Sequence, residues 1–256
     1  LLRLLSFWIG PWKKNINQYS IIIVFDSVAR PSLIKWIKKH AKCRLILWWW
    51  NVPTNEKTLL FYKKYCECVC FDEKKAKEKG MRFVQQFYIP NYNINSVEIE
   101  YDVIYVGYDK QRYKIIQNLA AKFSKLNLLF DFNLIRNNVS DYTDELGIKI
   151  RGIPIEYTEI IGLIQKSKAI LELNLSVQEG ITLRALESLF YEKKLITNNT
   201  HIKKFDFYCR ENIFILGEDN LNDLNLFLKT KYKKLDNSVK VDYMYDHWLE
   251  SILQVD

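Results

Sequence analysis

The stretch AILELNLSVQEGITLRALESLFYEKKLIT, residues 169–197, decides the fold class. Residues 169–173 form an apolar run, a polar loop follows, residues 180–191 form an amphipathic run, and residues 194–197 form a second short run. The two outer runs have the length of buried strands, and the middle run has the length of a helix. We therefore predict a strand, a helix that begins at Gly180 and a second strand, joined by a right-handed crossover in a parallel sheet.

The same alternation continues towards the N-terminus. We expect strands at 21–25, 44–50, 66–71, 103–106 and 126–130, and helices at 31–42, 56–65 and 111–123. Residues 89–100 contain Pro90 and several asparagines but no clear period, so they are the best linker candidate. We expect an α/β fold with two Rossmann-like domains, residues 1–95 and 101–238, and a cleft between them.

Composition excludes several classes of protein. The chain has 256 residues, of which 48% are hydrophobic and 27% charged, so it is neither disordered nor of low complexity. No apolar run approaches the roughly 20 residues that a membrane span needs.

The five cysteines include a C-x-C-x-C run at residues 66–70, whose thiols would share one face of a strand. We interpret them as reduced cytosolic cysteines, with a metal site a distant second, and expect no metal.

Charge divides the chain into two unequal parts. Residues 1–100 hold 17 Lys and Arg against 8 Asp and Glu, whereas residues 101–256 hold 21 against 22. Residues 30–44 concentrate the excess around Trp36, in the pattern of an amphipathic helix with a basic face. An ordinary solvated lysine face explains any single such helix. The excess over a hundred residues favours an anionic partner, such as a lipid headgroup surface or nucleic acid.

Two glutamates stand at the predicted loop and helix of the opening stretch. Ligands of parallel sheets bind beyond the carboxyl ends of the strands, where Glu179 and Gly180 are expected. The free amides of residues 181–183 would form a helix N-terminus that suits a phosphate. Glu187 follows Glu179 by eight residues, a little over two helical turns, so both carboxylates would face one groove and Glu187 would accept from a ribose. Alternatively, Glu179 only complements the helix dipole and Glu187 is a surface residue.

These residues also carry a resemblance to a known family. The segments that carry it, in order, are Ile153-Pro154, Tyr157, residues 167–171, Glu179-Gly180, residues 184–187 and residues 194–197. They resemble the C-terminal domain of GT-B glycosyltransferases of the retaining group with an E-x(7)-E motif. Within that group they are most similar to bacterial proteins of lipopolysaccharide or capsule biosynthesis. Residues 106–112 (VGYDKQR) and 71–76 (FDEKKA) are also similar to segments of that group. The resemblance covers roughly residues 66–217.

The resemblance implies a role for each matching residue. Glu179 would contact the hydroxyls of the donor sugar, and Glu187 would bind the ribose. Either Lys110 or Arg112 would neutralise the leaving diphosphate, although the family's order of Arg before Lys is reversed here. Ile153 would lie against the base, or pack in the core instead. The residues assigned in this way to the donor are Gly107, Lys110, Arg112, Ile153, Gly180, Ile181, Thr182, Leu183 and Glu187. The resemblance implies no cofactor or metal, and a C-terminal helix within residues 239–256 that crosses back to the first domain.

The first domain would receive the acceptor. Asp26 and Ser27 follow one predicted strand and Asn51 follows the next, so all three would line the acceptor side. Asp26 is a candidate general base for an inverting enzyme, but such a residue is more often a cap or turn residue. The family's first strand and Gly-rich loop match residues 4–10 poorly, so we expect that strand to be altered or cut away.

The sequence thus predicts a glycosyltransferase that moves a sugar, with retention of configuration, from a nucleoside-diphosphate sugar to a lipopolysaccharide or capsule glycan. The acceptor would be a glycan or a lipid-linked glycan, and the protein would be cytoplasmic and peripheral at the inner membrane face. Two alternatives remain open. One is a non-catalytic protein that binds nucleotide-sugar or a partner on the same scaffold. The other is a basic nucleic-acid-binding module, which ranks lower because no RNA-binding aromatic motif or zinc finger is present.

Overall fold

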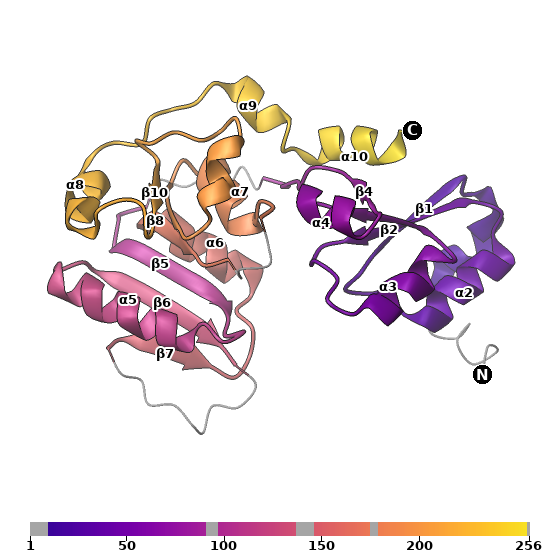
Figure 1. Cartoon of the computed structure of the whole chain (residues 1–256), viewed down its shortest axis with the longest axis horizontal. Coiled ribbons are helices and arrows are strands. Elements are labelled where there is room, and N and C mark those ends of the chain that lie inside the picture. The colour runs from indigo at the N-terminus through magenta and orange to yellow at the C-terminus, as the bar shows by residue number, and fades with distance from the viewer. Residues whose placement is uncertain (1–9, 91–96, 137–145, 175–178, 255–256) are drawn as a thin grey trace. The chain divides into compact units, whose positions relative to one another are not determined.

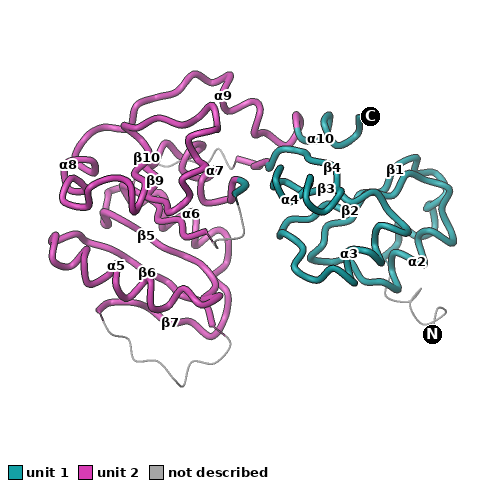
Figure 2. The backbone as a smooth tube through the Cα atoms, viewed as in Figure 1, with its two compact units in different colours: residues 1–86, 178–180, 248–256 teal, residues 87–177, 181–247 magenta. Residues whose placement is uncertain are grey.

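The computed structural model describes residues 10–90, 97–136, 146–174 and 179–254 (Figure 1). The chain divides into two compact units (Figure 2). The first contains residues 1–86, 178–180 and 248–256, and the second contains residues 87–177 and 181–247. Each unit is built on one parallel sheet. The predicted α/β class with two parallel-sheet domains is therefore confirmed.

The sheet of the first unit has four parallel strands in the order β1-β2-β3-β4. Their bounds are Ile21–Phe25 for β1, Arg44–Trp49 for β2, Glu67–Cys70 for β3 and Arg82–Phe83 for β4. The 3-10 helix η1 (Pro11–Gln18) precedes the sheet, and helices α2 (Pro31–His40), α3 (Glu56–Lys63) and α4 (Glu73–Glu78) connect the strands. Strand β2 is apolar and almost completely buried, as expected for the interior of a parallel sheet.

The C-terminal helix α10 (Tyr245–Leu253) joins the first unit from Trp248 onward. The Trp248 ring is buried and lies edge-on to Trp48, with 5.4 Å between the ring centroids. Arg44 and Arg82 donate to the backbone carbonyls of residues 251–254, at the end of this helix and one residue beyond it. Both arginines also pair with Glu67, which lies between them. Cations at a helix C-terminus satisfy its free carbonyls and complement its dipole, so these contacts fix the end of α10.

The sheet of the second unit has six parallel strands in the order β10-β9-β8-β5-β6-β7. Their bounds are Tyr101–Tyr108 for β5, Phe130–Ile135 for β6, Ile148–Arg151 for β7, Ser167–Glu172 for β8, Lys194–Thr197 for β9 and Ile213–Ile215 for β10. Read from β7 to β10, this is the doubly wound order of a Rossmann fold. The direction of winding reverses between β5 and β8, which are neighbours in the sheet. This switch point is where such folds bind their ligands.

Helices cover both faces of this sheet, and successive side chains along each strand pack on alternate faces. Ile104 and Ile170 pack with helices α6 (Tyr157–Gln165) and α7 (Leu183–Phe190). Val103 and Leu171, each one position away, pack on the other face with α5 (Tyr113–Lys125) and α8 (Leu224–Lys229). Successive side chains of a strand point to opposite faces, so an apolar strand supplies both cores. The short helices η2 (Thr200–Lys204), η3 (Leu221–Asp223) and α9 (Asn237–Val241) complete the unit.

One predicted strand is wrong. Residues 126–130 were expected to form a strand, but α5 extends to Lys125 and strand β6 begins only at Phe130. Strand β6 contains Asp131 and Asn133, both almost completely buried. Asp131 pairs with Lys149 at 2.9 Å, and Asn133 accepts from Arg151 at 2.7 Å. These partners on β7 compensate for the burial of polar groups, which local hydropathy cannot show.

Candidate functional site

The loop that follows β5 at the switch point has an unusual backbone. Lys110 and Gln111 have φ angles of 39° and 69°, in the left-handed region that residues other than glycine seldom adopt. Asp109 stabilises the turn, because its Oδ1 accepts from the Tyr113 amide at 3.0 Å and its Oδ2 pairs with Arg136 at 3.1 Å. Non-glycine residues held in this region are enriched at binding sites.

Arg112 is the half-buried cation of this loop. Its Nη1 donates to the Tyr108 carbonyl at 3.1 Å, whereas its buried Nε has no hydrogen-bond partner among the described residues. Gly107 lies in β5, and a Cβ there would stand 2.7 Å from the Tyr105 hydroxyl. Burial raises the pKa of Tyr105, and the positive charge of Arg112 acts in the opposite direction. A buried guanidinium N–H without an acceptor is the group that an anionic ligand would satisfy.

Lys110 lies near the Arg112 guanidinium, and its side chain is exposed to solvent. Partial desolvation lowers the pKa of Lys110 below its ordinary 10.5, and the like charge of Arg112 lowers it further. An anion bound by both side chains would offset this repulsion. The sequence offers Lys110 and Arg112 as alternatives, and in the structure the two charges lie close enough to interact.

Glu172 is a residue of this region that the sequence analysis missed. It ends β8 and is almost completely buried. Its two carboxylate oxygens accept from the hydroxyls of Thr182, at the start of α7, and Thr197, at the end of β9. Burial raises the pKa of Glu172, and the two threonines and the charges of Arg112 and Arg184 oppose this shift. The sequence did contain one indication of this residue, because Glu172 is the single acidic residue in the otherwise apolar run 169–173.

The helix after β8 begins later than predicted. Helix α7 starts at Leu183 rather than at Gly180, and Thr182 is its N-cap. The Thr182 hydroxyl accepts from the amides of Arg184 at 3.2 Å and Ala185 at 3.4 Å. A threonine cap with its side-chain oxygen on these amides is a strong start signal, and it excludes Gly180 from the helix. The prediction that one helix leads from Gly180 to Glu187 is wrong. Ile181, on the approach to this cap, is completely buried.

Glu187 lies on α7 and its side chain has no exposed surface. Its Oε2 pairs with Arg184, one turn earlier on the same helix, and the Arg184 Nε lies 3.3 Å from the Val106 carbonyl at the end of β5. Its Oε1 lies 3.0 Å from the Tyr157 hydroxyl, which in turn lies 2.8 Å from that of Tyr88. The alternative that Glu187 is a surface residue is therefore wrong. It is a buried, paired carboxylate that reaches towards the switch point through Arg184.

Glu179 belongs to the first unit, together with Gly180. Its Oε1 lies 2.5 Å from Lys74 Nζ, and its amide donates to Asp72 Oδ2 at 2.7 Å. The amide of Gly180 donates to the same oxygen at 2.9 Å. Of the backbone amides predicted to hold a phosphate, the Gly180 amide thus already has a carboxylate acceptor.

The remaining predicted residues lie on loops at strand ends. Ile153 follows β7 and is 76% exposed, so the alternative that it packs in the core is wrong. In the first unit, Asp26 accepts from the amides of Trp50 at 3.1 Å and Asn51 at 3.3 Å. Asp26 and Asn51 therefore meet at the carboxyl ends of β1 and β2, with the exposed Ser27 beside them. Both oxygens of Asp26 are engaged with backbone amides, which fits the predicted turn role.

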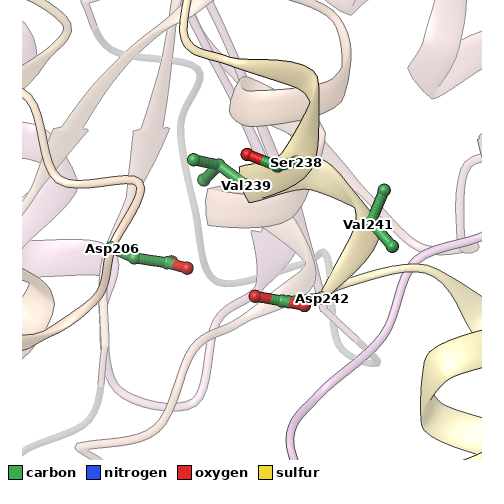
Figure 3. A pocket seen from close by; sticks show the side chains of 5 residues that line it. All are labelled: Asp206, Ser238, Val239, Val241 and Asp242. Carbon is green, nitrogen blue, oxygen red and sulfur yellow. The ribbon is translucent and has the colours of Figure 1, made fainter.

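A separate hollow of about 310 Å³ lies in the second unit (Figure 3). Its lining residues are Asp206, Ser238, Val239, Val241 and Asp242. Two carboxylates and no cation line it, so it is unsuited to a phosphate. Across the described ranges, no group of three or more His, Cys, Asp or Glu side chains could hold a metal ion. The cysteines of the C-x-C-x-C run are buried and free of disulfides.

No protein-family model matches the sequence, and no curated protein is significantly similar to it. Several solved structures match the fold. Anabaena HepE in complex with UDP and glucose gives a TM-score of 0.63 at 8% identity, over 94% of this chain and 78% of that one. An α-glucosyltransferase in complex with UDP and a 13-mer DNA gives 0.55 at 9% identity, over 94% and 82%. The trehalose-phosphate synthase of Burkholderia xenovorans gives 0.52 at 10% identity, over 99% and 75%. These are GT-B glycosyltransferases, so the predicted GT-B fold is confirmed.

Proposed function

We propose that this protein is a glycosyltransferase that moves a sugar from a nucleoside-diphosphate sugar to a glycan acceptor. The observation that carries the proposal is the buried Arg112 Nε, which has no partner among the described residues and lies in the loop at the switch point of a Rossmann sheet. An Arg and a Lys in this loop are suited to a diphosphate. The structural neighbours include proteins solved with UDP, which supports this class of donor.

The chemistry assigns these cations to the leaving group. In the transfer, an acceptor hydroxyl oxygen forms a bond to the anomeric carbon of the sugar while the bond from that carbon to the diphosphate oxygen breaks. The diphosphate leaves with the bonding electron pair, and the hydroxyl proton passes to a base or to the departing phosphate oxygen. Arg112 and Lys110 would stabilise the charge that develops on the diphosphate.

Further roles follow from the resemblance in the sequence. Glu179 would contact the donor sugar and the exposed Ile153 the base, with retention of configuration. Glu187 has no exposed side-chain surface and is paired with Arg184 and Tyr157, so the ribose contact that the resemblance implies would require one of these partners to be released. The amides of Ile181, Thr182 and Leu183 would contribute to diphosphate binding. Asp26, Ser27 and Asn51 would lie on the acceptor side. No metal or other cofactor is part of this proposal.

The acceptor we propose is a lipopolysaccharide or capsule glycan on a lipid carrier. What supports it is the exposed surface formed by η1 and α2, which we define by Trp12, Lys14, Lys38, Lys39 and Lys42. The Trp12 ring stands edge-on to the buried Trp36 at 6.2 Å. Exposed lysines and an exposed tryptophan on these elements suit an anionic lipid surface, so the protein would act at the inner membrane face. In the described part of the chain, no helix is long and apolar enough to cross a membrane.

The donor test is a thermal-shift and calorimetry panel with UDP, GDP, ADP, CMP and their common sugar conjugates. A ligand at about 100 times its Kd stabilises the folded state by about 2.7 kcal/mol, which raises the Tm by several degrees. Arg112→Met should weaken the binding of the preferred nucleotide at least tenfold. The exposed Arg210 provides the matched control, and Arg210→Met should leave binding unchanged. If no nucleotide or conjugate shifts the Tm of the unmodified protein, the proposal is wrong.

A further inference from the structure

The segment FDEKKA, residues 71–76, has no role in the proposed donor site, yet it contains a completely buried carboxylate. Asp72 follows β3 and caps α4, because its Oδ1 accepts from the Lys75 amide at 2.9 Å. Its Oδ2 accepts from the amides of Glu179 at 2.7 Å and Gly180 at 2.9 Å. One carboxylate therefore holds both a helix start and a loop more than a hundred residues away in the chain.

The absence of a side chain at Gly180 favours this contact. A Cβ at position 180 would stand 3.0 Å from the Phe71 ring and 3.1 Å from the Asp72 Cα, which is tighter than most real Cβ contacts, so these neighbours would have to move by a few tenths of an ångström. Glycine at position 180 therefore lets the backbone approach Asp72 without displacing its neighbours. The approach brings two adjacent amides onto one oxygen, in hydrogen bonds that the charge of the carboxylate strengthens.

The side chain of Glu179 is fixed from the same helix. Lys74 Nζ lies 2.5 Å from its Oε1, and the Glu179 side chain is 22% exposed while that of Lys74 is 54% exposed. Backbone and side chain are thus held by neighbouring residues, Asp72 and Lys74. An exposed ion pair alone contributes little, so the buried Asp72 is the stronger of the two restraints.

We propose that Asp72 is a positioning residue that sets the place of Glu179 for sugar transfer. This inference rests on the proposed function, in which Glu179 contacts the donor sugar. Asp72 touches no reacting group and acts only through the two amides. Loss of those bonds lets Glu179 move, and a misplacement of about 1 Å at a reacting centre costs up to about 100-fold in rate. Nucleotide affinity should persist, because Lys110, Arg112 and Ile153, which are proposed to bind the nucleotide, lie in the second unit.

Asp72→Asn is the test variant. Asn and Asp are equally good N-caps, so α4 keeps its start, but the amide nitrogen of Asn cannot accept from the Glu179 and Gly180 amides. The matched control is Asn55→Asp, the reverse exchange at the N-cap of α3, where the Asn55 side chain accepts from the Thr58 amide at 3.0 Å. We expect Asp72→Asn to lower kcat of transfer or donor hydrolysis by about 30- to 100-fold, with KM for the donor and Kd for the nucleotide within threefold of the original values. Asn55→Asp should change neither.

A second measurement does not depend on turnover. Amide hydrogen exchange at Glu179 and Gly180, followed by NMR, should be at least tenfold faster in Asp72→Asn and unchanged in Asn55→Asp. Gly180→Ala should speed exchange and lower kcat in the same way, by displacing the segment from Phe71. Faster exchange with unchanged kcat would overturn the positioning role, and unchanged exchange would overturn the anchor itself. An unmodified protein that binds no nucleotide would instead refute the proposed function, while the exchange data still decide whether Asp72 anchors the loop.

Discussion

The Tyr157 hydroxyl lies 3.0 Å from Oε1 of Glu187, a carboxylate with no exposed side-chain surface. A carboxylate only accepts hydrogen bonds, so Tyr157 donates to it and the Tyr88 hydroxyl, at 2.8 Å, donates to Tyr157. Burial and the charge of Glu187 both raise the pKa of Tyr157, so the hydroxyl keeps its proton at neutral pH. Three side chains, from α6, α7 and the segment before β5, thus form one chain of hydrogen bonds that fixes the glutamate.

Removal of one hydroxyl tests this chain. Tyr157→Phe takes away a hydrogen bond to a buried charged acceptor, which should lower the free energy of unfolding by about 1.5–3 kcal/mol. Urea unfolding measures the change. Tyr108→Phe is the control, because Tyr108 is 48% exposed, and it should have no effect beyond about 0.5 kcal/mol. Equal stabilities of the two variants would show that the Tyr157 hydroxyl contributes nothing.

The ion pair of Arg184 with Glu187 should contribute more. Arg184→Met leaves Glu187 buried without its cation, and we expect a loss of about 3 kcal/mol, the low end for a broken buried pair because Tyr157 still donates. The double variant Arg184→Met/Glu187→Met removes both charges and should recover most of this loss. Urea unfolding of both variants provides the measurement. A double variant as unstable as the single one would contradict an electrostatic cause.

Glu172 should make stability depend on pH. Burial raises its pKa in the folded protein above the ordinary 4.5, so the folded state holds the proton more tightly than the unfolded state. The stabilisation from this proton is complete below about pH 4.5 and is lost as the pH rises through the raised pKa. Glu172→Gln cannot ionise, so its stability relative to the unmodified protein should increase with pH and then level off. Urea unfolding at half-unit steps from pH 4 to 8 checks this, and a constant difference would refute it.

Lys110 should make nucleotide binding depend on pH. Desolvation and the charge of Arg112 lower its pKa below 10.5, so it loses its proton at a lower pH than an ordinary lysine. A diphosphate prefers the protonated form, so nucleotide affinity should fall as the pH rises from 7.5 to 10. Calorimetry should show this slope in the unmodified protein and in the control Lys114→Met, but a much smaller slope in Lys110→Met. Parallel slopes in all three would assign the pH dependence to another group.

The lysines of the η1 and α2 surface should mediate membrane binding. Each lysine near an anionic bilayer contributes about 1 kcal/mol, so replacing Lys38, Lys39 and Lys42 by Ser should weaken binding to phosphatidylglycerol-containing vesicles about 100-fold. The control replaces three exposed lysines of the second unit, Lys204, Lys229 and Lys231. Vesicle co-sedimentation at physiological salt measures both. Preferential binding to a DNA duplex over vesicles would favour a nucleic-acid acceptor instead.

Part of the site followed directly from the sequence. The sequence named Lys110 and Arg112 as alternative cations, because both lie in one short loop after a predicted strand, but it did not decide between them. The environment of Glu187 was not predictable, because its partner Tyr157 is 30 residues away and no pattern in the sequence near Glu187 indicates the contact. The start of α7 was also misplaced, because Gly180 resembles a helix boundary until its contact with Asp72 is known.

The sequence by itself determined the alternation of strands and helices, and with it the parallel sheets, because apolar periodicity is a local property. Only the tertiary structure decided that β8 lies beside β5, which creates the switch point. Only the tertiary structure decided that Asp72 accepts a hydrogen bond from the amide of Gly180, 108 residues away. The packing of the whole unit determines which strands are neighbours and which residues share hydrogen bonds. Contacts between residues that are distant in the chain therefore produce no local pattern from which they could be predicted.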